Sequence, residues 1–177
     1  GPAHVSVIIG SAPYAFAASR HHTPVVITGF EPLDVMQAVR MLVRQVNEGR
    51  AEVENEYTRA VTPAGNRKAQ ALMDAVLELR ATFAWRGLGE LPASALRIRP
   101  AFAAWDAETK FGLDDRPVPD HKSCECAAIL CGAKGPTDCK LFGTTCTPEN
   151  PIGSCMVSSE GAFAAHFSYG LYQDRAP

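Results

Sequence analysis

Residues 24–49 read PVVITGFEPLDVMQAVRMLVRQVNEG, and this stretch indicates the class of fold. Residues 24–28 (PVVIT) form a continuous nonpolar run, which is typical of a strand buried on both faces of a parallel sheet. After a turn at Gly29, Pro32 suits the first position of a helix, and nonpolar residues recur at helical spacing until Gly49. The stretch therefore predicts a buried strand, a turn and an amphipathic helix.

The segments on either side continue this alternation of strands and helices. Short runs of β-branched or nonpolar residues predict further strands at 4–9, 57–61 and 96–98. Longer periodic runs predict helices at about 66–83 and 102–111. Strands separated by helices of this length form βαβ units with right-handed crossovers, so we expect an α/β fold with a mostly parallel sheet flanked by helices.

The character of the sequence changes after residue 113. The segment DDRPVPDHKS (114–123) is polar and rich in proline, and the following residues contain many Gly and Pro with little periodicity. We therefore expect two domains, an α/β domain at 1–113 and a small cysteine-rich domain at 114–177 that binds an iron-sulfur cluster.

Composition and charge exclude several classes of function. The 177 residues are 46% hydrophobic and 20% charged, which is the mixture of an ordinary globular protein. Lys and Arg number 17 against 19 for Asp and Glu, so the charge balance favours neither nucleic acid nor an anionic membrane. The sequence contains neither a nonpolar run of the roughly 20 residues that span a bilayer nor a secretory signal, so we expect a cytoplasmic protein.

All six cysteines fall between Cys124 and Cys155. They form one CxC, followed by gaps of four, seven, six and eight residues, and no CxxC is present. Four interpretations compete: a secreted disulfide scaffold, structural zinc, buried free thiols, and an iron-sulfur cluster. The last is favoured, because loops can supply four thiolates at irregular spacing, and six cysteines then leave two thiols for a dithiol/disulfide couple.

Seven segments in the same order carry a resemblance to a known family. Besides the CxC at 124–126, they are PAHVSVIIG (2–10), TGFEPLDVMQAV (28–39), TPAGN (62–66), WRGLGELPAS (85–94), DCKLFG (138–143) and CTPENPIGSCMVSSEGA (146–162). By these segments the chain resembles the C-terminal half of the HypD family, whose members help to assemble the iron unit of nickel-iron hydrogenases.

The resemblance implies a [4Fe-4S] cluster beside a redox-active cysteine pair, similar to ferredoxin:thioredoxin reductase. By position, Cys124, Cys139 and Cys146 resemble cluster ligands, and Cys126 with Cys155 resembles the redox pair. The family pattern continues SSEGAC, but position 163 of this chain is phenylalanine, which cannot bind iron. Cys131 is the remaining sulfur, so the hypothesis is that it occupies the vacant ligand position; a three-cysteine cluster and a site without a cluster are the alternatives.

The family also implies a function and partners. Its members work as redox-active scaffolds in assembly of the Fe(CN)2CO unit, with a HypC-type chaperone and a HypE-type cyanide donor. The CGxHxH and GPGCPVC motifs of the family's N-terminal half are absent from these 177 residues. We therefore expect the chain to hold the cluster, but to carry transient iron only together with that other half. The alternatives are a disulfide reductase of the ferredoxin:thioredoxin reductase type and a binding module stapled by zinc or disulfides.

Five polar residues outside the cysteine segment have side chains that can serve either in a functional site or in the fold. The resemblance makes His4 and Glu31 candidates for positioning the iron unit or a partner, because PAHVS and GFEP resemble family segments that line a cleft. By itself, Glu31 would complement the dipole of the helix that Pro32 begins. We expect Asn66 to cap a helix, Arg86 to pair locally, and His166 to be structural.

Overall fold

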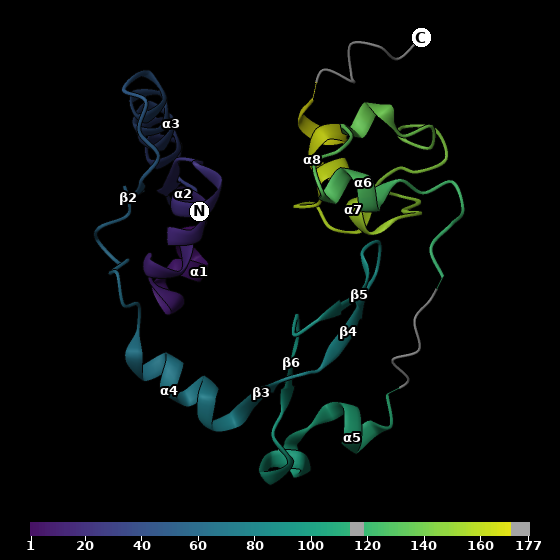
Figure 1. The fold of residues 1–177 in the computed structure, drawn as a ribbon. Helices are drawn as coiled ribbons and strands as arrows, with labels where there is room; N and C mark the ends of the chain where they lie inside the picture. Colours follow the sequence, from purple (N-terminus) through teal and green to yellow (C-terminus); the bar gives the residue numbers. More distant parts are fainter. Residues whose placement is uncertain (114–118, 171–177) are drawn as a thin grey trace. The chain divides into compact units, whose positions relative to one another are not determined.

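The computed structural model of the chain describes residues 1–113 and 119–170 (Figure 1). The chain forms two compact units, Gly1–Leu77 and Glu78–Pro177. Every cysteine lies in the second unit, whereas the candidate residues His4 and Glu31 lie in the first. The predicted domain boundary at residue 114 falls outside the described residues, so that division of the chain stays a prediction.

The first unit is built around the strand and helix predicted from residues 24–49. Strand β1 (Val25–Ile27) leads through α3 (Pro32–Asn47) to β2 (Val53–Asn55), and the two strands pair in parallel with Val25 opposite Val53. This strand, helix, strand order confirms the predicted βαβ unit. The predicted strand at 57–61 is wrong, because β2 ends at Asn55 and the chain then turns, with the Val61 N–H donating to the Tyr57 carbonyl.

Helix α3 packs one side against the small parallel sheet. Its buried residues are Asp34, Ala38 and Gln45. The side-chain oxygen of Gln45 accepts the backbone N–H of Glu52 at 2.8 Å, which ties the helix to the start of β2. Met41 and Leu42 are partly buried, whereas the other large nonpolar residues of the helix are exposed: Leu33, Val35, Met36, Val39, Val43 and Val46.

The predicted strand at 4–9 is wrong, because this segment forms helix α1 (Ala3–Ile9). Pro2 has an extended backbone, and Ala3 and Ser6 are the buried positions, a spacing that fits a helix and not a strand. The Ser6 hydroxyl donates to the Pro2 carbonyl at 2.8 Å, one helical turn back. Burial on one helical face therefore outweighs the strand preference of the β-branched residues.

The first unit contains three further elements, of which the sequence predicts only the last. They are a 3-10 turn η1 (Ala12–Tyr14), α2 (Ala15–His21) and α4 (Arg67–Val76). The helix predicted at 66–83 ends at Val76, and strand β3 begins at the next residue. The core of the unit consists of Ala3, Ile27 and Val61, with partly buried Val7, Tyr14, Val53 and Tyr57 packed against them.

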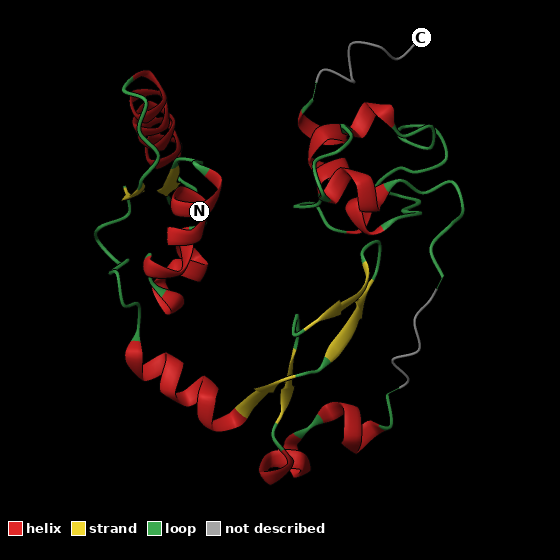
Figure 2. Cartoon of the chain, in the orientation of Figure 1, coloured by secondary structure: helices red, strands yellow, loops and turns green. Residues whose placement is uncertain are grey.

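The second unit begins with four short strands, coloured yellow in Figure 2. Strands β3 (Leu77–Leu79) and β6 (Leu96–Ile98) pair with each other, and β4 (Thr82–Trp85) pairs antiparallel with β5 (Gly89–Pro92) as a hairpin. The predicted strand at 96–98 is confirmed as β6. The helix predicted at 102–111 is divided into a 3-10 helix η2 (Pro100–Trp105) and α5 (Ala107–Phe111).

The cysteine segment folds into short helices joined by turns. These are α6 (Cys126–Leu130), η3 (Pro136–Asp138), α7 (Ser154–Val157) and α8 (Ala162–Tyr169). The described residues thus form an α/β structure of helices and three two-stranded sheets, and the mostly parallel sheet is not confirmed. Within residues 1–113 and 119–170, no helix combines the length and nonpolar character that crossing a lipid bilayer requires.

The core of the first unit gives a direct test of this packing. Ile27 is fully buried, so Ile27→Ala should lower the free energy of unfolding of that unit by about 2–5 kcal/mol. Leu33→Ala is the matched control, because Leu33 is 83% exposed and its truncation should change stability by less than about 0.5 kcal/mol. Urea denaturation followed by circular dichroism measures both, and equal effects of the two substitutions would contradict the described core.

Candidate functional site

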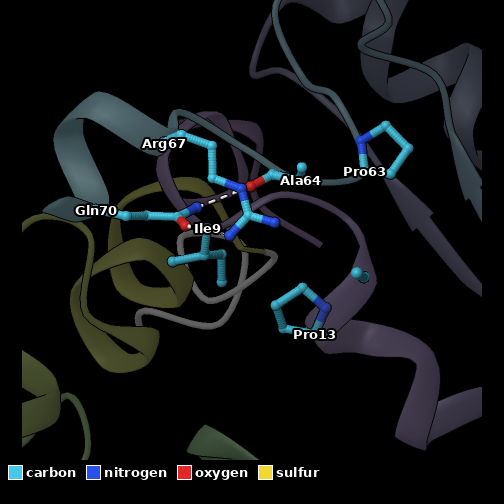
Figure 3. Close-up of a pocket in the computed structure, with 7 residues that line it drawn as sticks. Ile9, Pro13, Pro63, Ala64, Arg67 and Gln70 are labelled. Carbon is cyan, nitrogen blue, oxygen red and sulfur yellow. Dashed lines mark hydrogen bonds between the residues drawn. The ribbon is translucent and has the colours of Figure 1, made fainter.

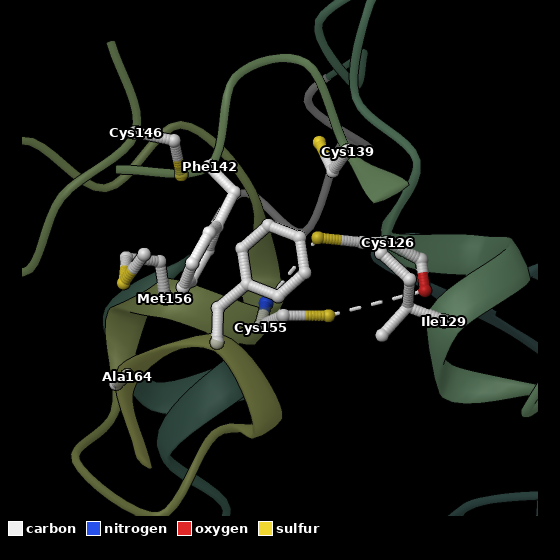
Figure 4. Close-up of a cluster of buried hydrophobic side chains, with 9 residues drawn as sticks. Cys126, Ile129, Cys139, Phe142, Cys146, Cys155, Met156 and Ala164 are labelled. Atoms are coloured by element: carbon white, nitrogen blue, oxygen red, sulfur yellow. Dashed lines mark hydrogen bonds between the residues drawn. The ribbon is translucent and has the colours of Figure 1, made fainter. Parts of the chain in front are cut away.

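The core of the second unit is built largely from thiols. Cys126, Cys139, Cys146 and Cys155 are each at most 4% exposed, and Cys124 is partly buried against them. Large nonpolar side chains complete this cysteine core, among them Phe142 and Met156 (Figure 4). Phe163 belongs to the same core. Five of the six cysteines therefore share one nonpolar environment, and all six are free thiols.

Cys126 and Cys155 are in direct contact in this core. The backbone N–H of Cys155 donates to the Cys126 sulfur at 3.4 Å, and the Cys155 thiol lies 3.9 Å from the Cys126 carbonyl oxygen (Figure 4). Cys126 is the first residue of α6, and Cys155 is the second residue of α7. The structure thus brings together the two residues that the resemblance suggests as a redox pair, although their redox activity stays a prediction.

Gly153 brings a third sulfur into this arrangement. A Cβ atom at Gly153 would overlap the sulfur atoms of both Cys124 and Cys126, so the two sulfurs lie side by side against this glycine. Gly153 has an ordinary extended backbone, and it is therefore required for space and not for a special backbone conformation. Cys124, Cys126 and Cys155 form a continuous series of thiols.

Burial raises the pKa of two of these thiols, Cys124 and Cys126. For Cys124, loss of solvation is the main cause and raises the pKa to about 11. Burial likewise raises the pKa of Cys126, and the hydrogen bond from the Cys155 N–H acts in the opposite direction. In the metal-free chain, both thiols are therefore protonated and weakly nucleophilic at neutral pH.

The other two predicted ligands lie in the same core. Cys139 is buried, and the Cys146 sulfur accepts the backbone N–H of Ile152 at 3.4 Å. Across residues 1–113 and 119–170, however, no three His, Cys, Asp or Glu side chains converge closely enough to hold one metal ion. The structure therefore brings Cys124, Cys139 and Cys146 into one core without closing a metal site, and their role as ligands stays a prediction.

The two residues at issue for the fourth ligand lie in opposite environments. Cys131 follows the last residue of α6 and is exposed, outside the cysteine core. Phe163 is 2% exposed, and its ring packs edge-on against Phe142 at 5.1 Å between centroids. The phenylalanine therefore fills the core with a nonpolar ring at the position where the family pattern has a thiol.

A separate group of polar residues surrounds the GFEP segment in the first unit. The His4 ring stacks on the exposed ring of Phe30, with 5.2 Å between centroids. Glu31 is exposed and accepts a hydrogen bond from Arg59 at 3.1 Å. The same guanidinium donates to both oxygens of the buried Asp34, at 3.0 and 2.6 Å. His4 and Glu31 thus flank Phe30, and Arg59 links Glu31 to helix α3.

Arg59 is a residue of this group that the sequence pattern does not reveal. Its partners lie 25 and 28 positions away, and no spacing rule connects them. Its guanidinium carbon also stacks over the Tyr57 ring at 3.7 Å. The pKa of the neighbouring Glu56 is raised, mainly by burial of its carboxyl group and secondly by the negative charge of Asp34. The burial of Asp34, which requires a cationic partner, is visible only in the structure, so the sequence offers no signal for Arg59.

An open pocket of about 330 Å³ also lies in the first unit (Figure 3). Its walls come from the end of α1, η1 and the TPAGN segment, and Arg67 and Gln70 of α4 line it. The Gln70 amide donates to the carbonyls of Ile8 and Ala64 at 2.7 and 2.8 Å, which fixes α4 against α1 and this loop. Neither His4 nor Glu31 lines the pocket.

Two structural expectations from the sequence have clear outcomes. Asn66 is the N-cap of α4, and its side chain accepts the backbone N–H of Ala69 at 3.1 Å, which confirms the predicted cap. The expected local partner of Arg86 is wrong, because its contacts are the Ile152 carbonyl, 66 positions away, and the Asp120 carboxylate.

The two units together define a class of protein, an α/β protein that carries a cysteine core in a separate unit. The model of the HypD family, described as "Hydrogenase formation hypA family", matches residues 1–170, and the chain belongs to this family. The resemblance found in the sequence is thereby confirmed.

Relatives from several bacteria support this membership. The hydrogenase maturation factor HypD of Cupriavidus necator is 68% identical over 174 residues, which are 98% of this chain and 46% of that protein. The factor of the same name from Azotobacter vinelandii is 64% identical over 170 residues, 96% of this chain and 45% of that protein. The Escherichia coli factor is 42% identical over 175 residues, 99% of this chain and 47% of that protein. The chain spans about half the length of the curated relatives it matches.

The close approach at Gly153 leads to a specific prediction. Gly153→Ala should lower the free energy of unfolding of the second unit by roughly 1–3 kcal/mol, because the added methyl group must displace the sulfurs of Cys124 and Cys126. Gly135→Ala is the matched control, since Gly135 also has an ordinary backbone and its Cβ would only touch Asp138 at 3.5 Å. Thermal denaturation of the metal-free chain measures both, and an unperturbed Gly153→Ala variant would contradict the sulfur positions.

Proposed function

We propose that this chain forms the thiol-bearing part of a hydrogenase maturation factor, a redox-active scaffold in assembly of the Fe(CN)2CO unit of nickel-iron hydrogenases. The observation that carries the proposal is the contact of Cys126 with Cys155 inside a core that also holds Cys124, Cys139 and Cys146. Membership of the HypD family, whose relatives include hydrogenase maturation factors, supplies the biological context.

The proposed resident cofactor is a [4Fe-4S] cluster held by Cys124, Cys139 and Cys146. Their thiols fit the group chemically, because iron-sulfur clusters are bound by cysteine thiolates. Their common core excludes water, which would protect a cluster of this kind. Cys131 is exposed and outside the core, so the proposal favours the three-cysteine alternative over a fourth ligand from Cys131. When bound, such a cluster supplies one-electron chemistry.

The roles of the chain's own residues follow from their contacts. Cys126 and Cys155 form the dithiol of the proposed redox couple, and the Cys155 N–H stabilises the Cys126 thiolate when it forms. Because burial opposes that thiolate, the couple is unreactive until a base or a neighbouring positive charge favours its ionisation. The buried position thus protects the dithiol from unspecific oxidation.

The first unit has a supporting role in this proposal. His4 and Glu31 position the iron unit or a partner, and Arg59 fixes the Glu31 carboxylate. The partners are a HypC-type chaperone and a HypE-type cyanide donor, and the site of action is the cytoplasm. Transient iron is carried by the longer protein and not by this chain alone.

The Cys126 and Cys155 contact equally suits a disulfide reductase of the ferredoxin:thioredoxin reductase type. An assay with an oxidised thioredoxin-like substrate separates the two functions, since a maturation scaffold should not turn this substrate over. The stapled binding module differs from both, because it predicts a colourless protein with stoichiometric zinc.

Iron binding is tested by anaerobic reconstitution with iron and sulfide. The chain should become brown and absorb near ~400 nm, and Cys139→Ser should lose most of the bound iron. Cys131→Ser should keep the iron content of the parent chain, whereas Phe163→Cys should hold the cluster more tightly against a chelator. Iron loss in Cys131→Ser would instead assign the fourth ligand to Cys131, and a chain that binds no iron would remove the cluster from the proposal.

The maturation role is tested in a chimaera. Replacing the matching part of the Cupriavidus necator factor by this chain should restore hydrogenase activity in cells that lack the factor. Cys126→Ser or Cys155→Ser should abolish this restoration, and Cys131→Ser should not. Full hydrogenase activity with both pair cysteines substituted would contradict the proposed couple.

A further inference from the structure

The turn that joins β4 to β5 packs against the cysteine core. Gly87 lies in this turn and is buried, although its neighbours Arg86 and Leu88 are exposed. Its backbone φ is +84°, a conformation that favours glycine. A Cβ atom at Gly87 would lie 3.1 Å from the Ser154 hydroxyl oxygen and 3.5 Å from the Cys126 Cβ. The turn therefore rests directly on Cys126 and on the residue that precedes Cys155.

Polar contacts on both sides hold the turn in this place. The Arg86 guanidinium donates to the Ile152 carbonyl at 2.9 Å, and its Nε lies 3.6 Å from the Asp120 carboxylate. The other oxygen of Asp120 accepts the Gly87 N–H at 2.9 Å. Arg86 and Asp120 thus attach the turn both to the segment before α7 and to the segment before Cys124.

These attachments are weaker than the packing beneath them. The side chains of Arg86 and Asp120 are 45% and 37% exposed, so water competes for their contacts. Cys126 and Cys155 below the turn are each only 2% exposed. The Ser154 hydroxyl is buried and has no hydrogen-bond partner among the described residues. Gly87 therefore contacts Ser154 by packing alone. An opening of the turn therefore breaks these polar contacts together with the packing of Gly87 on Ser154 and Cys126.

We propose that Arg86 is a positioning residue, which holds the turn over Cys126 and Cys155 and thereby controls the access of other molecules to this thiol pair. Release of Arg86 from Ile152 and Asp120 exposes the pair to a disulfide-bearing or thiol-bearing partner. The inference rests on the proposed function only for the role of the pair, because the packing of the turn against Cys126 and Ser154 is a separate structural property.

Alkylation of the metal-free chain by iodoacetamide tests this inference residue by residue, with peptide mass spectrometry as the readout. In Arg86→Ala, Cys126 and Cys155 should be labelled at least about tenfold faster than in the parent chain, since labelling follows the population of the open turn. Cys139 should keep its rate, because it is buried in the same core and does not contact Gly87 of the turn. Cys146 is not a control of this kind, because its sulfur is hydrogen-bonded to Ile152, which Arg86 holds. The exposed Cys131 serves as the internal reference.

Three further variants make the result specific. Arg86→Lys keeps the positive charge beside Asp120 and should restore most of the protection. Asp120→Ala removes both the partner of Arg86 and the acceptor of the Gly87 N–H, and it should reproduce the selective increase. Arg97→Ala removes an ion pair with Glu78 in the same unit, and it should leave all labelling rates unchanged.

Two outcomes would overturn the inference. Unchanged labelling of Cys126 and Cys155 in both Arg86→Ala and Asp120→Ala would show that the turn does not protect them. A parallel increase at Cys139 would show that the substitutions loosen the whole core. Either outcome leaves the reconstitution and the chimaera results untouched, so a failure here is distinguishable from a failure of the proposed function.

Discussion

The second unit depends on one constraint, the packing of thiols in a nonpolar core from which water is excluded. Cys126 and Cys155 touch there, and Cys124 joins them only because position 153 is glycine. Burial raises the pKa of Cys124 and Cys126 and keeps both thiols protonated. The same packing therefore stabilises the fold and limits access to the thiols, and we propose that opening of the turn controls when the dithiol reacts.

The first unit presents a different kind of chemistry around GFEP. Glu31 is exposed but is tied through Arg59 to the buried Asp34, so its carboxylate is positioned by the interior of the unit. His4 and Phe30 stack beside it on the same surface. A carboxylate, an imidazole and an exposed aromatic ring are suited to hold a polar partner segment, whereas the thiols of the second unit are suited to redox chemistry. Each unit thus contributes a distinct part of the proposed scaffold.

Local patterns predicted the elements that local forces determine. The strand β1, the helix α3 and the N-cap Asn66 follow from nonpolar periodicity and capping chemistry, and the structure confirms them. The sequence predicts a strand where helix α1 lies, because the β-branched residues of this segment favour strands. Burial of Ala3 and Ser6 on one face stabilises the helix instead. The contacts of Arg59 and Arg86 join residues far apart in the sequence, and no local pattern contains them. The pairing of Cys126 with Cys155 came from the family resemblance, because spacing alone does not select two cysteines from six.

Disulfide mapping after mild oxidation tests the central claim most directly. The metal-free chain is treated with oxidised glutathione, quenched at low pH and digested, and the crosslinked peptides are identified by mass spectrometry. The exposed Cys131 should react early as a mixed disulfide with glutathione, whereas the buried pair should react slowly. Because Cys126 and Cys155 are already in contact, the account predicts that their disulfide predominates among the disulfides formed within the chain when oxidation is complete. Predominance of a disulfide between Cys139 and Cys146, or of one between Cys131 and another cysteine of the chain, would show that the thiols are arranged differently and would contradict the account.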